Sequence, residues 1–133
     1  MEKTNLFLGA LLAGMAVAAG AFGAHGLQQI TSDAQVLQTY HTAVQYHFWH
    51  AIALLMCGAL SKIGQQQLNY WARQSFLAGL VCFSGSLYFL TYLRINHLTV
   101  SKWVVLITPI GGLFFISAWV LLAFSFAKIK PSN

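Results

Sequence analysis

Histidines are the residues of this sequence that could take part in the widest range of chemical roles. Three of the five lie close together in the sequence. His47 and His50 are three residues apart, so a helix would place them on one face, and His41 precedes them by about two turns. Another histidine, His25, ends the preceding apolar run. Imidazole can bind zinc or haem iron and can relay protons. We expect His25 and His50 to lie at similar depths, face the interior and approach each other or a shared polar partner.

Other polar side chains inside the apolar runs add to this candidate site. They are Tyr46, His47, Ser84, Ser86, Tyr88 and Thr108. Polar residues within membrane spans often mark function. Counted along helices, these groups converge on the outer half of the predicted molecule, while the inner half is predicted to be apolar.

Three interpretations of these residues stay open. The first is that His, Ser and Tyr side chains form hydrogen bonds between helices, and this is the one we favour. The second is a haem or metal site on His25 and His50, although no cysteine or acid lies beside them. The third is a proton relay or a path for a small solute, although no Asp or Glu falls inside a predicted span. Because no acid completes a triad with Ser84 or Ser86, we expect no enzymatic activity.

The composition places these residues in a membrane. Of the 133 residues, 58% are hydrophobic and 7% are charged, whereas a soluble domain has about 25% charged residues. The formal charge of +5 comes from single Lys and Arg residues near the ends of apolar runs. That pattern is typical of a membrane protein and not of a nucleic-acid-binding surface. We therefore expect one domain, residues 1–133, whose partner is the lipid bilayer and not a nucleic acid.

Four apolar runs predict an all-α fold, an integral membrane four-helix bundle. The spans are expected at about 5–26, 42–61, 74–93 and 103–126. An interfacial amphipathic segment is predicted before the second span, beginning at Asp33. The first run has the length of a span, so we expect it to be retained and not cleaved as a signal peptide. Pro109 predicts a kink in the last helix.

Small residues predict where the helices touch. In lipid, close approach of backbones at small side chains is what brings helices together. The first run carries small residues at four-residue spacing, so we expect the first helix to be the most buried, held between its neighbours. The predicted packing positions are Gly14, Gly20, Gly85, Gly111 and Gly112.

The basic residues predict the orientation in the membrane. The N-terminus, the second loop and the C-terminus hold five of them, Lys3, Lys62, Arg73, Lys128 and Lys130. The first and third loops hold only Arg94 and Lys102. Since cytoplasmic loops carry the excess of Lys and Arg, both termini are expected to be cytoplasmic.

Four motifs in order give the chain a family resemblance. They are GAFGAHGL at 20–27, YHFWHAIALL at 46–55, FSGSLY at 83–88, and TPIGG at 108–112 followed by Trp119. Together they resemble domain-of-unknown-function family 423, which comprises small bacterial membrane proteins and the eukaryotic transmembrane protein 256. The resemblance implies a four-helix protein of a bacterial plasma membrane with no established activity. Within it, His25, Tyr46 and His50 fall on family positions, and His41 and His47 do not.

The sequence therefore leaves three functions to distinguish. A structural or interaction protein, associating with itself or with a larger membrane complex, is the one that we favour. A haem- or metal-binding module using His25 and His50 is the alternative, and a small-solute carrier or channel is the third. The cofactor, if there is one, stays unknown.

Overall fold

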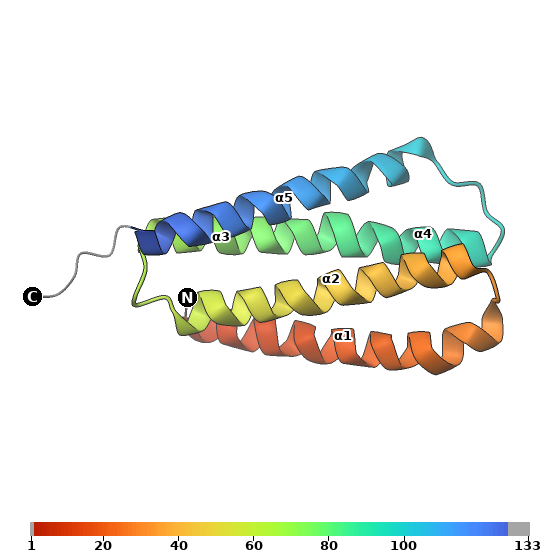
Figure 1. Cartoon of the computed structure of the whole chain (residues 1–133), viewed down its shortest axis with the longest axis horizontal. Helices are drawn as coiled ribbons and strands as arrows, with labels where there is room; N and C mark the ends of the chain where they lie inside the picture. The colour runs from red at the N-terminus through yellow and green to blue at the C-terminus, as the bar shows by residue number, and fades with distance from the viewer. Residues whose placement is uncertain (1, 128–133) are drawn as a thin grey trace, which may run out of the picture.

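Four long helices run antiparallel along the molecule in the computed structural model, which describes residues 2–127 (Figure 1). They are α1 (Glu2–Ile30), α2 (Ala34–Ala59), a third helix made of α3 (Gln66–Gly79), η1 (Leu80–Gly85) and α4 (Ser86–Ile95), and α5 (Lys102–Ala127). No strand occurs between residues 2 and 127. The predicted all-α fold class is thus confirmed.

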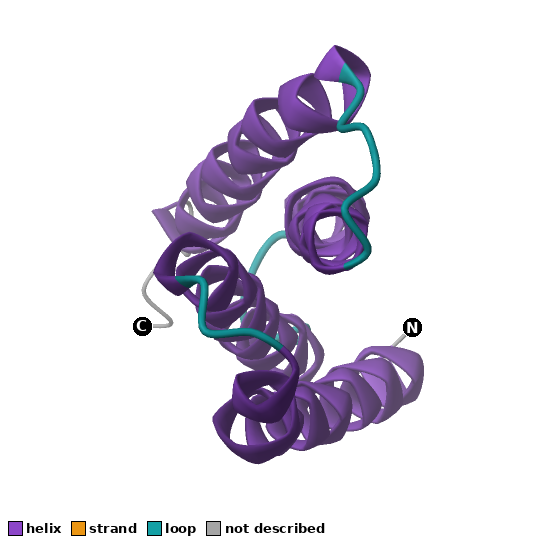
Figure 2. Ribbon diagram, turned by 90° about the vertical axis from the view of Figure 1, so that its right-hand side faces the viewer, coloured by secondary structure: helices purple, strands orange, loops and turns teal. Residues whose placement is uncertain are grey.

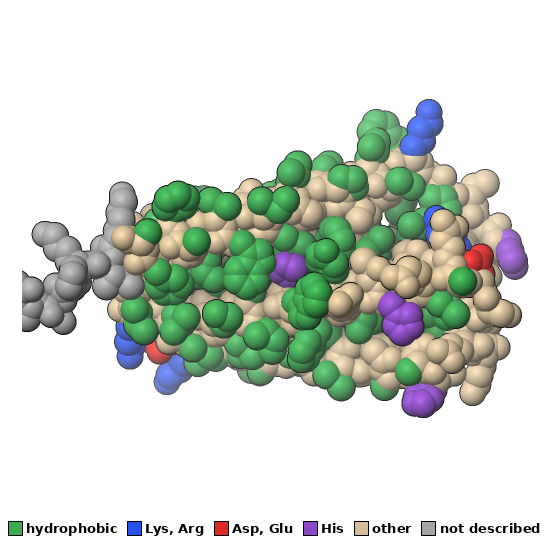
Figure 3. Space-filling model, viewed as in Figure 1, with side chains coloured by type: hydrophobic (Ala, Val, Ile, Leu, Met, Phe, Trp, Pro, Cys, Tyr) green, Lys and Arg blue, Asp and Glu red, His purple; other side chains and the backbone are tan. Residues whose placement is uncertain are grey.

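Three of the four helices are long and apolar enough to cross a membrane: α1, the continuous helix 66–95, and α5. The fourth, α2, is 26 residues long but is less apolar, and it does not meet that measure. Hydrophobic side chains cover most of the face drawn in Figure 3, with the Lys, Arg, Asp and Glu side chains gathered toward its two ends. This distribution fits helices that cross a bilayer.

The start of α2 is set by a local cap. The Asp33 carboxylate accepts hydrogen bonds from the backbone N–H groups of Gln35 (2.8 Å) and Val36 (3.3 Å), which have no partner inside the helix. From Ala34 the helix continues without a break to Ala59. The segment predicted to be interfacial thus forms the first turns of α2 and runs into the rest of that helix. Its location at the membrane interface stays a prediction.

The core lies between α2, the third helix and α5, and α1 packs beside it (Figure 2). Large side chains such as Leu54, Phe76, Phe115 and Leu122 fill that core. Of the 29 residues of α1 only five are buried, against ten of the 26 in α2. The prediction that the first helix is the most buried was wrong. A helix rich in Ala and Gly has little side-chain volume to contribute to a core, so it lies flat against one neighbour.

The packing face of α1 also differs from the predicted one. Gly9, Ala16 and Gly23 are buried at seven-residue spacing, the repeat of left-handed helix pairs. A Cβ added at Gly9 would lie 2.8 Å from Leu55. At Gly14 it would meet nothing within 4 Å, since two residues from Ala16 is about 160° around the helix. Gly14 is thus not a packing point within the chain.

The remaining predicted packing glycines differ among themselves. A Cβ at Gly20 would meet only Val44, at 3.4 Å. One at Gly111 would overlap the backbone of Phe83, so α5 and η1 touch there. Gly85 and Gly112 have only ordinary contacts, at 3.7 Å and 3.9 Å. Gly79 was missed, although a Cβ there would overlap the Phe115 ring.

Pro109 lies inside α5, which the structure records as one helix from Lys102 to Ala127. Opposite it, η1 is a short π-helical stretch inside the third helix. Such π-helical turns are rare and leave backbone groups out of the regular hydrogen-bond series. Toward Lys102, α5 diverges from the third helix (Figure 1). The predicted kink at Pro109 stays a prediction.

Candidate functional site

His50 is a polar side chain of the core with contacts at both ring nitrogens and on the face of its ring. It is 4% exposed and lies 16 residues after the first residue of α2 and nine before the last. Its Nδ1 is 2.7 Å from the backbone carbonyl oxygen of Tyr46, and its Nε2 is 3.3 Å from Nε1 of Trp119. A carbonyl can only accept and an indole N–H can only donate, so Nδ1 carries the proton and Nε2 accepts. Both ring nitrogens are therefore engaged, and the ring is neutral.

Aromatic rings surround the same imidazole. Its ring stacks on Phe115 with centroids 3.4 Å apart and planes 7° from parallel. The rings of Tyr46, Phe76 and Trp119 lie within 6.2 Å of it, centroid to centroid. Side chains of α2, the third helix and α5 thus meet around one histidine. Because each helix contributes at least one ring, the cluster determines how the three pack together.

His25 lies elsewhere, and its predicted approach to His50 was wrong. The side chain of His25 is exposed. α1 and α2 are antiparallel, with Gly23 against Tyr40 and Gly9 against Ala51. The part of α1 level with His50 is therefore about twelve residues before His25, or roughly 18 Å along the helix.

The cause of this error is the length of α2. The prediction began the second span at residue 42 and placed His50 about one turn inside it. The cap at Asp33 starts the helix at Ala34, so that His50 lies 16 residues from its start. Two histidines this far apart cannot ligate one metal or one haem. The positions of the two side chains therefore do not support the predicted haem or metal module on His25 and His50.

His47 belongs to a second, separate set of contacts. Its Nδ1 is 3.3 Å from the hydroxyl oxygen of Tyr88, and the Tyr88 ring meets the Tyr40 ring edge to face. The Tyr40 hydroxyl donates to the backbone carbonyl oxygen of Ala19 (2.9 Å). This set links α1, α2 and α4. His41, by contrast, is exposed.

A third set joins the third helix to α5. The Ser86 hydroxyl donates to the backbone carbonyl oxygen of Phe83 (2.9 Å) at the end of η1. Its oxygen also lies 2.7 Å from Oγ1 of Thr108. A hydroxyl has one proton to donate, so Thr108 is the donor to Ser86. Ser84 is buried nearby, and its hydroxyl has no partner within the described residues.

The predicted polar cluster is therefore three separate hydrogen-bonded sets, each of which connects helices. Such bonds hold membrane helices in register. Within residues 2–127 no three His, Cys, Asp or Glu side chains lie close enough together to hold a metal ion. The geometry supports the hydrogen-bond interpretation of these residues.

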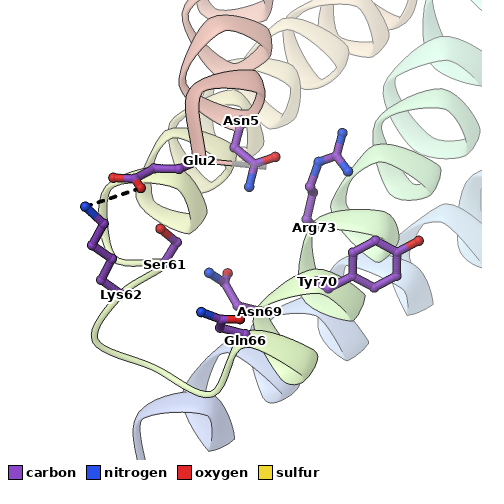
Figure 4. A pocket seen from close by; sticks show the side chains of 8 residues that line it. All are labelled: Glu2, Asn5, Ser61, Lys62, Gln66, Asn69, Tyr70 and Arg73. Atoms are coloured by element: carbon purple, nitrogen blue, oxygen red, sulfur yellow. Dashed lines mark ion pairs between the residues drawn. The ribbon is translucent and has the colours of Figure 1, made fainter.

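The prediction of an apolar inner half was also wrong. At the end of the molecule that holds Glu2, polar residues of α1, the α2–α3 connection and α3 line a pocket (Figure 4). Asn5 and Asn69 are buried there. The signal in the sequence was an asparagine at the start of an otherwise apolar run, and sequence reasoning passed over it.

Known proteins resemble the chain over most of its length. Residues 19–112 match the family described as "Protein of unknown function (DUF423)". The chain belongs to this family. It is 41% identical to "UPF0382 membrane protein YwdK" of Bacillus subtilis over 130 residues, which are 95% of this chain and 98% of that protein. No solved structure matches it.

Two further relatives come from other bacteria. A "UPF0382 membrane protein" of Haemophilus influenzae is 38% identical over 130 residues, 98% of each chain. "UPF0382 membrane protein SAB0533" of Staphylococcus aureus is 44% identical over 120 residues, 90% of this chain and 92% of that protein. These names agree with the three long apolar helices: members of the family are membrane proteins.

Proposed function

We propose that this chain is a structural interaction protein of a bacterial plasma membrane, which crosses the bilayer four times and pairs with a second copy through α1 and α2. The helix α2 runs antiparallel to α1 and is nearly as long. If α1 and the third helix both cross the bilayer, α2 has to return through the same layer. Two of the side chains that make α2 less apolar, His47 and His50, are buried among its neighbours. The side chains of Gln35, Gln38, His41 and Gln45 are exposed.

The observation that carries the pairing is the position of Gln45. Its side chain is exposed on α2. It lies 11 residues after Ala34 and 14 before Ala59, or about 17 Å and 21 Å from the two ends of the helix. The hydrocarbon layer is about 30 Å thick, so this amide lies within it. An amide that faces lipid has no hydrogen-bond partner, which is costly.

The surface around Gln45 permits close approach. A shallow groove of about 330 Å³ runs between the two helices α1 and α2. It is lined on α1 by Ala16, Val17 and Gly20, and on α2 by Val44, Gln45, Phe48 and Trp49. Between residues 10 and 24 of α1, the exposed residues within one sector of about 80° around the helix are small. They are Ala10, Gly14, Val17, Ala21 and Ala24. None is larger than valine, so a neighbouring helix can approach the backbone closely.

A second copy supplies the chemistry that this face requires. Two copies inserted in the same direction are related by a twofold axis along the membrane normal, so equal residues meet at equal depth. The Gln45 amide carries both a donor and an acceptor, and two such amides satisfy each other. The pairing face is thus self-complementary.

The test is the dimer fraction in lipid bilayers, measured by single-molecule photobleaching over a range of protein-to-lipid ratios. Gln45→Leu removes the amide and keeps the side chain's bulk, and we expect the dimer to weaken about tenfold. Gly14→Leu should weaken it by obstruction, since nothing inside the chain contacts that position. Val81→Leu, on a residue of η1 that is 74% exposed, is the control and should leave the dimer unchanged. A wild-type chain that stays monomeric at every ratio would overturn the proposal.

A further inference from the structure

The pocket at the Glu2 end has features that helix packing does not require. It encloses about 250 Å³ and is lined by Glu2, Asn5, Ser61, Lys62, Gln66, Asn69, Tyr70 and Arg73. Three of these are charged, out of nine Asp, Glu, Lys and Arg residues in the chain (seven basic and two acidic). Figure 4 shows them on the start of α1, the α2–α3 connection and the first turns of α3.

Two buried side-chain oxygens in this pocket lack hydrogen-bond partners. Asn5 is 4% exposed and Asn69 is 6% exposed, and the side-chain oxygen of each has no hydrogen-bond partner within the described residues. The Asn69 Nδ2 donates to the backbone carbonyl oxygen of Cys57 (2.8 Å). Because that carbonyl can only accept, the remaining atom of the Asn69 amide is an oxygen. The pocket therefore contains buried hydrogen-bond acceptors that a ligand with a donor group could satisfy.

Cationic groups line the same pocket. The Nε of Arg73 is buried without a partner, and its Nη1 donates to Gln74 (3.1 Å). Lys62 lies at the rim, with Nζ 3.7 Å from Oε2 of Glu2 and most of its side chain exposed. A guanidinium and an ammonium are the groups with which proteins bind phosphate. The ligand of this pocket should therefore combine an anion with a hydrogen-bond donor.

The position of the pocket along the helices further limits which ligands could bind there. It lies where α1 begins and α2 ends, and Tyr70 lines it on the α3 side. The next residue of α3, Trp71, is half exposed. Tyrosine and tryptophan are enriched at the level of the lipid headgroups. The volume is below the usual range for drug-sized ligands, so a small polar group fits it better.

We propose that this pocket binds a phosphoethanolamine group, the headgroup of an aminophospholipid. Arg73 and Lys62 bind the phosphate, and the ammonium donates to the side-chain oxygens of Asn5 and Asn69, with Glu2 nearby. A phosphate alone would leave the two amide oxygens without a donor. The inference is independent of dimer pairing, because the pocket and Gln45 lie on different parts of the surface.

Native mass spectrometry of the full chain in mild detergent tests this proposal, with short-chain phosphatidylethanolamine, phosphatidylglycerol and phosphatidylcholine as probes. The wild-type chain should bind phosphatidylethanolamine about tenfold more tightly than the other two. Soluble phosphoethanolamine is a fourth probe. If it binds as tightly as the lipid, the ligand is the free phosphomonoester, and if it binds only weakly, the ligand is the lipid.

Two variants separate the two halves of the ligand. Asn5→Leu removes one acceptor at similar volume, so it should abolish the preference for phosphatidylethanolamine over phosphatidylglycerol without lowering thermal stability. Arg73→Gln should weaken binding of both lipids about tenfold. Arg94→Gln is the matched control, since it removes the same charge at the far end of the third helix. Equal binding of all three lipids, or an equal loss in Arg94→Gln, would refute the site.

Discussion

At the residue scale, His50 shows how this protein uses polar groups in its core. Its imidazole is buried, and each ring nitrogen is matched to a group of opposite hydrogen-bonding character on Tyr46 or Trp119. In the core of a bilayer an imidazole N–H without a protein acceptor has no water molecule to accept its hydrogen bond. The histidine thus acts as a connector between α2 and α5, and its aromatic stacking on Phe115 adds to the same contact.

His50→Ala should destabilise the fold by about 2–4 kcal/mol. It removes a buried ring and leaves the Trp119 indole N–H without its acceptor. His25→Ala should change the free energy of unfolding by no more than about 0.5 kcal/mol, because the side chain is exposed. Reversible unfolding in mixed detergent micelles measures both. A loss in His25→Ala as large as that in His50→Ala would contradict the assignment of the two residues.

At the element scale, α1 has two faces with different roles. One face packs on α2 through Gly9, Ala16 and Gly23, and the Tyr40 hydroxyl adds a hydrogen bond to the α1 backbone. The other faces outward with small residues. Because α1 contributes little to the core, its attachment depends mainly on close backbone contact with a single helix.

This difference between the two faces predicts opposite outcomes for two identical substitutions. Gly9→Leu should destabilise the monomer by about 2 kcal/mol or more, because its side chain would overlap Leu55 and the Ala51 carbonyl. Gly14→Leu should leave the stability of the monomer within about 0.5 kcal/mol of the wild type. Thermal unfolding in detergent, at concentrations too low for dimers, compares them directly. If Gly14→Leu were the more damaging, the observed register of α1 would be wrong.

At the scale of the whole molecule, most of the basic residues belong to the end of the helices where the chain begins and α5 ends. Glu2, the α2–α3 connection and Ala127 lie at one end (Figure 1), and the connections 31–33 and 96–101 lie at the other. The first end carries most of the basic residues, with Lys128 and Lys130 following Ala127 in the sequence. A bilayer across the apolar middle would therefore place the more basic end in the cytoplasm.

Both termini are thus expected to be cytoplasmic. A fluorescent protein that matures only in the cytoplasm should be bright when fused after Asn133, and alkaline phosphatase, which is active only outside it, should be inactive there. A cysteine at Ser32 should react with an impermeant thiol reagent added to intact cells. Labelling of Ser32→Cys only after the cells are broken would reverse the orientation. The control is the unsubstituted chain, which measures any labelling of its own cysteines, the buried Cys57 and the partly exposed Cys82.

The sequence by itself determined the features that depend on local or additive properties. Apolar runs long enough to span a bilayer predicted the helices. The capping sequence from Ser32 to Gln35 predicted a helix start at Asp33, one residue before the observed start at Ala34. The observed cap is Asp33, and its hydrogen bonds reach only three residues. The family motifs were equally readable, because they are contiguous. The same cap also contained the information that placed His50 deep in α2, which the predicted span boundary at residue 42 ignored.

Only the tertiary structure decided which face of each helix meets another. In a membrane protein the outer surface is as apolar as the core, so hydrophobic periodicity does not mark the buried side. Gly14 and Gly9 are therefore equivalent in the sequence, and the large side chains of α2 select between them. The antiparallel register of the helices likewise separates His25 from His50. It also places Asn5 and Asn69, which are far apart in the chain, in the same pocket. No local rule contains that register, because it results from the packing of all the helices at once.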